Sequence, residues 1–372
     1  MTRTSSNSVD LASALAAHGV GHGPADGLSD RVGEIYVMLT WRCNLRCRMC
    51  PMWGDHGFCV DGGTGEERLT VDDVVSFVRG ARAHRPRAVT ISGGEPLLSD
   101  LCAPLIRALG DLGLRVMLTT NGTLLEEMAV DDIARLHQVN LSIDGPPLVL
   151  DQLGRGGEAT LSKAISGLGH VQSARRGRRP GLKLLTVITP EGASHLAEML
   201  ELFSDAGVAF DSHLFQHQMF LSPRDAVRHE RALEDLLGPG VPIWQAMVSE
   251  GRGPDIGRLI EEMRAVRRIC PDAVFSPELD DEQVRRYYEQ ESWVPEELSS
   301  HCLSPWFDVA ITPDGNVWLC PGFSVGSIHE SGFEEIWNGA RARRLRRAVA
   351  EGGIFPGCRA CFYLYNYRSD GQ

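Results

Sequence analysis

The chain has no apolar run long enough to span a bilayer, and residues 1–30 lack the charged start and apolar block of a secretion signal. It also lacks an excess of basic residues, since Asp and Glu outnumber Lys and Arg by 49 to 37 and the formal net charge is -12. Such a charge repels the phosphate backbone of nucleic acids. These absences predict a cytoplasmic protein whose partners are neither membranes nor nucleic acids.

The ten cysteines cannot be explained as a disulfide framework, because cytoplasmic thiols stay reduced. Three of them, Cys59, Cys102 and Cys270, stand apart, and an isolated cysteine is by default an inert core thiol. The others fall into two groups, which favours metal ligation. The groups are Cys43, Cys47 and Cys50, and then Cys302, Cys320, Cys358 and Cys361.

From Glu34 onward, short apolar runs alternate with amphipathic stretches, a pattern that predicts an α/β fold of strand–helix units around a parallel sheet. Expected strands are 34–40, 88–92, 115–120, 139–144, 183–189 and 209–215, and expected helices are 71–84, 101–112, 124–136, 161–174 and 195–206. Six units predict a partial parallel (β/α)6 barrel, because a full eight-stranded barrel needs more chain than residues 34–221 provide. The loops that follow the strands should carry the site.

Four parts are expected along the chain: a flexible lead-in at 1–33, the partial barrel at 34–221, a helical connector at 222–300, and a small domain at 301–372. The connector has helical patterns and does not read as another barrel unit. The small domain shows a β-hairpin signal with a Pro-Asp-Gly turn, followed by a helix near 333–349. Four cysteines in so short a segment indicate that a metal centre helps it to fold.

Cys43, Cys47 and Cys50 form a CxxxCxxC group directly after the first predicted strand, so one loop can hold three corners of a cluster. Soft thiolates suit iron–sulfur clusters, and three of them leave one iron of a 4Fe–4S cluster open to an external ligand. Zinc is the alternative, but a structural zinc site needs a fourth ligand and usually uses paired CxxC knuckles.

A second motif, ISGGEP, ends the second predicted strand. Gly93 and Gly94 allow close approach of the backbone to a ligand, and Glu95 can pair with an ammonium group. CxxxCxxC after the first strand with GGEP after the second resembles the radical S-adenosylmethionine superfamily, over roughly residues 34–215. The resemblance implies that the open iron binds the methionine amino and carboxylate groups of S-adenosylmethionine, and that the GGE segment holds the amino group.

The resemblance also implies cofactor contacts for Asn121, Ser142 and Arg155, which follow or end the next two strands near the ribose and the methionine carboxylate. Met49 stands where the family usually has an aromatic residue beside the adenine, and its polarizable sulfur can still pack on a base. The implied chemistry is one-electron cleavage of S-adenosylmethionine to methionine and a 5′-deoxyadenosyl radical. A reducing partner such as flavodoxin or ferredoxin would supply the electron.

Cys302, Cys320, Cys358 and Cys361 combine a C…GxxxxC pattern with a terminal CxxC. This resembles the Twitch segment, a shortened relative of the SPASM domain that follows some radical S-adenosylmethionine barrels, and it implies a second, auxiliary 4Fe–4S cluster. Zinc held by four cysteines is the alternative. Residues 362–372 contain no further cysteine, so one auxiliary cluster is expected. The arrangement is most similar to that of aminocyclitol dehydrogenases and also resembles sugar epimerases.

These resemblances predict an enzyme that takes a hydrogen atom from a carbohydrate-like, aminocyclitol or related small-molecule substrate of natural-product metabolism. The outcome is either dehydrogenation or epimerisation, and the auxiliary cluster either accepts an electron or is purely structural. An epimerase needs a thiol that returns hydrogen, for which Cys270 is the candidate catalytic residue. Tyr287 and Tyr288 are alternative donors expected at the surface, and His217 and Gln218 are candidates for binding hydroxyl groups.

Two other functions remain open at this stage. The first is modification of a ribosomally made peptide, for which the lead-in is shorter than the roughly 50 residues of a small recognition domain. The second is a non-enzymatic metal-binding scaffold, in which CxxxCxxC and GGEP occur together by coincidence.

Overall fold

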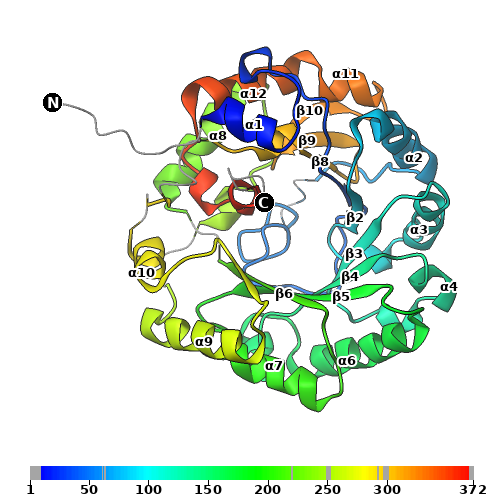
Figure 1. Cartoon of the computed structure of the whole chain (residues 1–372), viewed down its shortest axis with the longest axis vertical. Helices are drawn as coiled ribbons and strands as arrows, with labels where there is room; N and C mark the ends of the chain where they lie inside the picture. Colours follow the sequence, from blue (N-terminus) through cyan, green and yellow to red (C-terminus); the bar gives the residue numbers. More distant parts are fainter. Residues whose placement is uncertain are drawn as a thin grey trace.

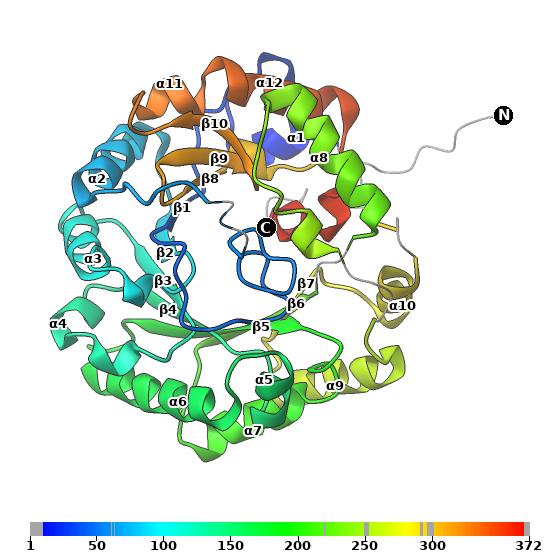
Figure 2. The same cartoon turned by 180° about the vertical axis from the view of Figure 1, so that it is seen from behind.

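A computed structural model describes residues 10–60, 62, 64–218, 221–248, 253–290, 293–295 and 301–367. Its ten strands form one sheet in the order β10-β9-β8-β1-β2-β3-β4-β5-β6-β7. The sheet curves into a ring with helices along its outside (Figures 1 and 2). The strands are β1 Glu34–Met38, β2 Ala88–Ser92, β3 Val116–Thr120, β4 Gln138–Ser142, β5 Gly181–Ile188, β6 Ser212–His217, β7 Val274–Ser276, β8 Asp308–Ile311, β9 Asn316–Cys320 and β10 Phe323–Ser327.

The parallel α/β class expected from the sequence is confirmed, and the barrel is larger than the six predicted units. β7 pairs in parallel with β6, and β8 pairs in parallel with β1 on the other side. Residues 222–300 are therefore not only a helical connector, as the sequence predicts, because they also contain the barrel strand β7. This strand has three residues, too few for an alternating pattern to be visible. β8, β9 and β10 then run antiparallel, so the predicted hairpin continues the sheet of the barrel.

The helices cover the outer face of the sheet, and several begin at clear caps. Thr70 and Asp73 form a capping box at the start of α2, which buries Val74 and Val78 one turn apart. The described helices are α1 Leu11–Ala17, α2 Val71–Gly80, α3 Cys102–Asp111, α4 Val130–Ile133, α5 Pro147–Gln152, α6 Gly157–Ala174, α7 Leu196–Asp205, α8 Pro223–Leu237, α9 Ile256–Ile269, α10 Asp281–Glu289, α11 Phe333–Trp337 and α12 Ala340–Gly352. None of those found in the described residues is long and apolar enough to cross a membrane.

Two predicted helices are interrupted. The one expected at 124–136 is a 3-10 turn followed by the short α4, because Met128 and Ala129 adopt extended backbone between the buried Leu125 and Ile133. The one expected near 333–349 is divided into α11 and α12 at Asn338 and Gly339, where the backbone leaves the helical conformation.

The segment 10–33 packs against the C-terminal part of the chain, in contrast to the flexible lead-in predicted for residues 1–33. Leu11 and Leu15 of α1 are buried. The Ser29 hydroxyl donates to the carbonyl oxygen of Trp306 at 2.8 Å, and the indole of Trp337 donates to the carbonyl oxygen of Ser29 at 3.0 Å. Residues 1–9 lie outside the described part. This segment packs against residues about 300 positions later in the chain, so its sequence alone does not reveal the packing.

Candidate functional site

The loop after β1 carries the first group of cysteines and runs into the interior of the ring (Figure 2). It turns tightly, since the backbone N–H of Cys50 donates to the carbonyl oxygen of Cys47 at 2.9 Å and that of Leu45 donates to Cys43 Sγ at 3.4 Å. The pKa of Cys47 is raised to about 12, chiefly by burial, while Arg155 opposes this rise and the neighbouring cysteines add to it. Met49 lies half-buried in the same turn. One loop therefore presents three thiols, as the spacing predicts.

Gly93 and Gly94 lie against this cysteine loop. The backbone N–H of Gly94 donates to the carbonyl oxygen of Thr40, and that of Glu95 donates to the carbonyl oxygen of Arg42, both at 2.8 Å. Gly93 has a φ of +133°, and a Cβ there would lie 2.6 Å from the Thr40 oxygen. The ISGGEP motif predicts close approach of a ligand to these glycines. In the structure, the backbone that approaches them is the loop that presents the cysteines.

The Glu95 side chain is fully buried between the carboxyl ends of β2 and β3. One carboxylate oxygen accepts from the Thr120 hydroxyl at 2.8 Å and from the N–H of Leu97 at 3.2 Å, and the other accepts from the N–H of Asn121 at 2.9 Å. Burial raises the pKa of Glu95 and these hydrogen bonds lower it, with a net increase. A buried carboxylate in this position can bind an ammonium group.

Arg155 is buried beside the cysteine loop and contacts both Asp144 and Ser142. Its guanidinium pairs with Asp144 and donates to the carbonyl oxygen of Ser142 at 2.6 Å. Burial lowers the pKa of Arg155, but Asp144 raises it, and the net change is upward. The Arg155 Nε is buried without a hydrogen-bond partner among the described residues. Ser142 and Arg155 are therefore brought together, next to Cys47.

Asn121 belongs to a hydrogen-bond network that also includes residues the sequence analysis missed. Its amide donates to Asn44 Oδ1 at 2.9 Å, and Asn44 in turn donates to the Thr123 hydroxyl at 2.8 Å. Asn44 lies inside the CxxxCxxC motif, which is the signal that could have identified it. Glu67 accepts from the Thr40 hydroxyl at 2.7 Å and holds the start of the loop, but nothing in its local sequence indicates this.

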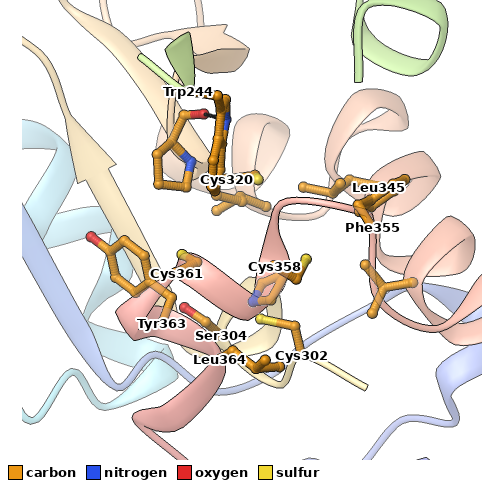
Figure 3. A pocket seen from close by; sticks show the side chains of 14 residues that line it. Trp244, Cys302, Ser304, Cys320, Leu345, Phe355, Cys358, Cys361, Tyr363 and Leu364 are labelled. Atoms are coloured by element: carbon orange, nitrogen blue, oxygen red, sulfur yellow. Dashed lines mark hydrogen bonds between the residues drawn. The ribbon is translucent and has the colours of Figure 1, made fainter. Parts of the chain in front are cut away.

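The second group of cysteines surrounds a cavity (Figure 3). Cys302 precedes β8, Cys320 ends β9, and Cys358 and Cys361 flank a 3-10 turn. Burial raises the pKa of all four thiols, to about 12 for Cys358 and Cys361. The other walls are largely apolar and include Trp244. Four thiols around a largely apolar cavity fit an iron–sulfur cluster, whose binding would release the thiol protons. Among the described side chains, no three His, Cys, Asp or Glu converge closely enough to bind a single metal ion.

Cys270 lies away from both groups. It caps the C-terminus of α9 and precedes β7, with its Sγ 3.8 Å from the Nε2 of His213 near the amino end of β6. The other predicted cofactor residues follow the carboxyl ends of parallel strands. Strands rise about 3.3 Å per residue, so the six residues of β6 separate the two edges of the sheet by roughly 17 Å. This placement does not support the predicted role of Cys270 as the hydrogen donor.

The expectation that Tyr287 and Tyr288 lie at the surface is wrong for Tyr287, which is 2% exposed, while Tyr288 is half-buried. His217, at the end of β6, packs against both rings, and its Nδ1 lies 2.8 Å from the Tyr288 hydroxyl. Burial lowers the pKa of His217 to about 3, so the ring is neutral. Gln218 accepts from the Tyr287 hydroxyl through its carbonyl oxygen at 3.4 Å. These contacts join β6 to α10, while the Nε2 of His217 is buried without a hydrogen-bond partner among the described residues.

Two family descriptions match the chain. Residues 37–210 match the radical SAM superfamily, where SAM denotes S-adenosylmethionine, and residues 302–362 match the iron–sulfur cluster-binding domain called SPASM. The first range contains the cysteine loop and the GGE segment, and the second contains the four cysteines around the cavity.

Several named proteins are similar in sequence. Pre-heme d1 synthase of Dinoroseobacter shibae is 28% identical, over 81% of this chain and 72% of that protein. AdoMet-dependent heme synthase of Methanosarcina barkeri is 25% identical, over 87% of both chains. The probable GTP 3′,8-cyclase of Sulfolobus acidocaldarius is 30% identical, but the match covers 47% of this chain and 53% of the cyclase. The chain thus spans about half the length of that relative.

Solved structures share the fold at low sequence identity. SuiB of Streptococcus suis bound to S-adenosylmethionine superposes with a TM-score of 0.60 at 13% identity, over 89% of this chain and 70% of SuiB. The enzyme anSMEcpe with bound AdoMet gives a TM-score of 0.53 at 16% identity, over 84% of this chain and 82% of that one.

Proposed function

Since the chain carries a radical S-adenosylmethionine domain followed by an iron–sulfur cluster-binding domain of the SPASM type, we propose that it is an oxidoreductase that dehydrogenates a small organic molecule. Its cofactors are a 4Fe–4S cluster that binds S-adenosylmethionine and an auxiliary cluster. The reaction also requires a reductant and a substrate. The proposal rests on the presence of two sites in one chain: the cysteine loop with its GGE segment, and a separate cavity enclosed by four thiols.

The residues would have different binding roles according to their positions. Cys43, Cys47 and Cys50 would hold the first cluster, and Glu95 would bind the methionine ammonium. When bound, the first cluster with S-adenosylmethionine supplies a 5′-deoxyadenosyl radical, and the auxiliary cluster supplies a one-electron acceptor. Arg155 places a buried positive charge beside the cysteine loop, where the methionine carboxylate would bind. The curved sheet around this loop would exclude water and competing hydrogen donors.

Dehydrogenation is favoured over epimerisation by where the side chains lie. Loss of a hydrogen atom from a secondary alcohol carbon, followed by loss of one electron and one proton, yields a ketone. The released electron equals the one consumed in cleaving S-adenosylmethionine, so the electrons balance. Epimerisation would instead need a hydrogen donor near the radical, and Cys270 lies at the opposite edge of the sheet.

The substrate is proposed only as a class. The class of small organic molecules includes the carbohydrate-like or aminocyclitol substrate predicted from the sequence. The relatives named as heme synthases and GTP cyclases suggest other small molecules of this class. Peptide modification is the second candidate, because the shared fold includes SuiB bound to its precursor peptide SuiA, with a TM-score of 0.56.

The test is anaerobic reconstitution with iron and sulfide, reduction by dithionite, and measurement of methionine, 5′-deoxyadenosine and substrate-derived product. We expect a substrate to accelerate 5′-deoxyadenosine formation and to give a product lighter by two hydrogen atoms. Cys270→Ala should form this product at the wild-type rate, without deuterium from heavy water. An inverted product that carries solvent deuterium and disappears in Cys270→Ala would contradict the proposal in favour of epimerisation.

A further inference from the structure

His229 on α8 is fully buried next to the wall of the cavity that the four thiols surround. The centroid of its ring lies 3.9 Å from that of Trp244 and 5.9 Å from that of Phe355. Both aromatic residues line the cavity, whereas His229 is not among the lining residues (Figure 3). The histidine therefore supports the wall of the second cluster site from behind.

The Nδ1 of His229 binds the chain directly before the CxxC pair. It accepts a hydrogen bond from the backbone N–H of Gly357 at 2.9 Å. Gly357 is the N-cap of the 3-10 turn that carries Cys358 and leads into Cys361. The contact is close, since a Cβ at Gly357 would lie 2.8 Å from the Cγ of His229. A helix 128 positions earlier thus supplies the acceptor for this buried N–H.

Trp244 connects the same histidine to the segment of Cys320. The indole of Trp244 donates to the carbonyl oxygen of Pro321 at 3.1 Å, and Pro321 directly follows Cys320. The next residue, Gln245, donates to Glu230 of α8 at 2.7 Å and holds this part of the chain against the helix. One imidazole therefore contacts the supports of two thiol-bearing segments, the end of β9 and the CxxC turn.

The His229 ring is neutral and carries its proton on Nε2. Burial lowers the pKa of His229 to about 3, and Nδ1 must be unprotonated to accept the N–H of Gly357. The Nε2 is buried without a hydrogen-bond partner among the described residues, which costs free energy. A phenylalanine would fill this site without that cost. The acceptor at Nδ1 is therefore the feature that a histidine provides here.

Building on the proposed function, in which the auxiliary cluster accepts an electron, we infer that His229 is a positioning residue that sets the reduction potential of that cluster through the Gly357 N–H. While this N–H is bound to Nδ1, it is not available to a sulfur atom of the cluster. Hydrogen bonds to sulfur and access of water both favour the reduced cluster, which carries one more negative charge, and so raise its potential. His229 therefore keeps the potential lower than it would be without the acceptor.

The test compares His229→Phe, which keeps a ring but loses the acceptor, with His229→Asn, whose Oδ1 takes the position of Nδ1. Each protein is reconstituted with both clusters, reduced stepwise and followed by EPR spectroscopy. S-adenosylmethionine added to a parallel sample identifies the signal of the first cluster, which it changes. For the other signal, we expect a ratio of reduced to oxidised cluster about tenfold higher in His229→Phe than in the wild type at the same potential. This corresponds to about 59 mV for a one-electron couple. His229→Asn should stay close to the wild type.

His170→Phe is the matched control. It also removes an imidazole from a backbone group, since the Nε2 of His170 lies 2.8 Å from the carbonyl oxygen of Met128, but on α6 within the radical S-adenosylmethionine domain. It should leave the auxiliary signal unchanged.

An unchanged or lower potential in His229→Phe would overturn the inference, as would the same shift in His229→Asn. Loss of the auxiliary signal in both His229 variants would also overturn it, because ring volume and not the acceptor would then be required. Loss in His229→Phe alone would support it, since the acceptor would then be needed to hold the cluster. Formation of 5′-deoxyadenosine and of the oxidised product by the wild type is measured separately, so a failure of the proposed function can be distinguished from a failure of this inference.

Discussion

At the scale of single residues, Glu95 connects the two motifs that identify the site. Its backbone N–H binds the cysteine loop through Arg42, and its carboxylate receives hydrogen bonds from Thr120 and Asn121 at the end of β3. One residue thus holds three consecutive strand ends in place. Its charge, buried without an ion pair to a described residue, is available for a cationic group of a cofactor.

We expect Glu95→Gln to weaken S-adenosylmethionine binding by at least about tenfold, which corresponds to about 1.4 kcal/mol. The change removes the negative charge and sets an amide N–H2 against existing donors, while the thiols that hold the clusters are untouched. Equilibrium binding and iron content of the reconstituted protein are the measurements. Glu126→Gln, at an exposed position on the same side of β3, is the matched control. Wild-type affinity in Glu95→Gln would remove Glu95 from the binding site.

At the scale of elements, α12 joins the segment 10–33 to the residues that precede β8. Arg346 on this helix is fully buried and lies 4.3 Å from the ring centroid of Trp337. It donates to the carbonyl oxygen of Pro305 at 2.7 Å and to that of Gly27 at 3.1 Å. Burial lowers the pKa of Arg346 to about 9. The same helix contributes Leu345 and Val349 to the cavity of the four cysteines, so its position affects the second site.

Arg346→Met should therefore destabilise the fold by roughly 2–4 kcal/mol, because buried carbonyl groups lose their donors. Arg346→Lys should recover little, since one ammonium cannot reach both carbonyl groups as the planar guanidinium does. Thermal unfolding and limited proteolysis of segment 10–33 are the measurements. Arg344→Met, at an exposed position on the same helix, should remain close to the wild type. Equal protease resistance in Arg346→Met and the wild type would contradict this account.

At the scale of the whole molecule, the two cluster sites belong to one continuous sheet but use separate segments. The first depends on the loop between β1 and α2, whereas the second depends on β8, β9 and the chain after α12. Since no cysteine is shared, each cluster should form without the other.

Replacing Cys43, Cys47 and Cys50 together by Ala should abolish 5′-deoxyadenosine formation and leave about four irons per chain at the second site. Iron analysis after anaerobic reconstitution provides the measurement, with Cys102→Ala as a control outside both groups. An iron content near zero would mean that the second cluster depends on the first.

The sequence by itself determined the α/β class and the two groups of cysteines, and it supplied the candidate residues for binding S-adenosylmethionine. These depend on short-range features: strand and helix periodicity, and motifs whose members lie within a few positions of each other. Glu95, Asn121 and Ser142 could be named in this way because each follows or ends a strand that is itself recognisable, whereas Arg155 follows α5 and was named from the resemblance alone.

Only the tertiary structure decided that β8 joins β1, that β7 extends the barrel, and that residues 10–33 pack against the C-terminal segment. It also placed Cys270 near the amino edge of the sheet, away from the cysteine loop. The physical reason is that strand neighbours, and the face to which each strand residue points, follow from pairing between residues far apart in the chain. Local patterns of hydrophobicity do not encode that pairing.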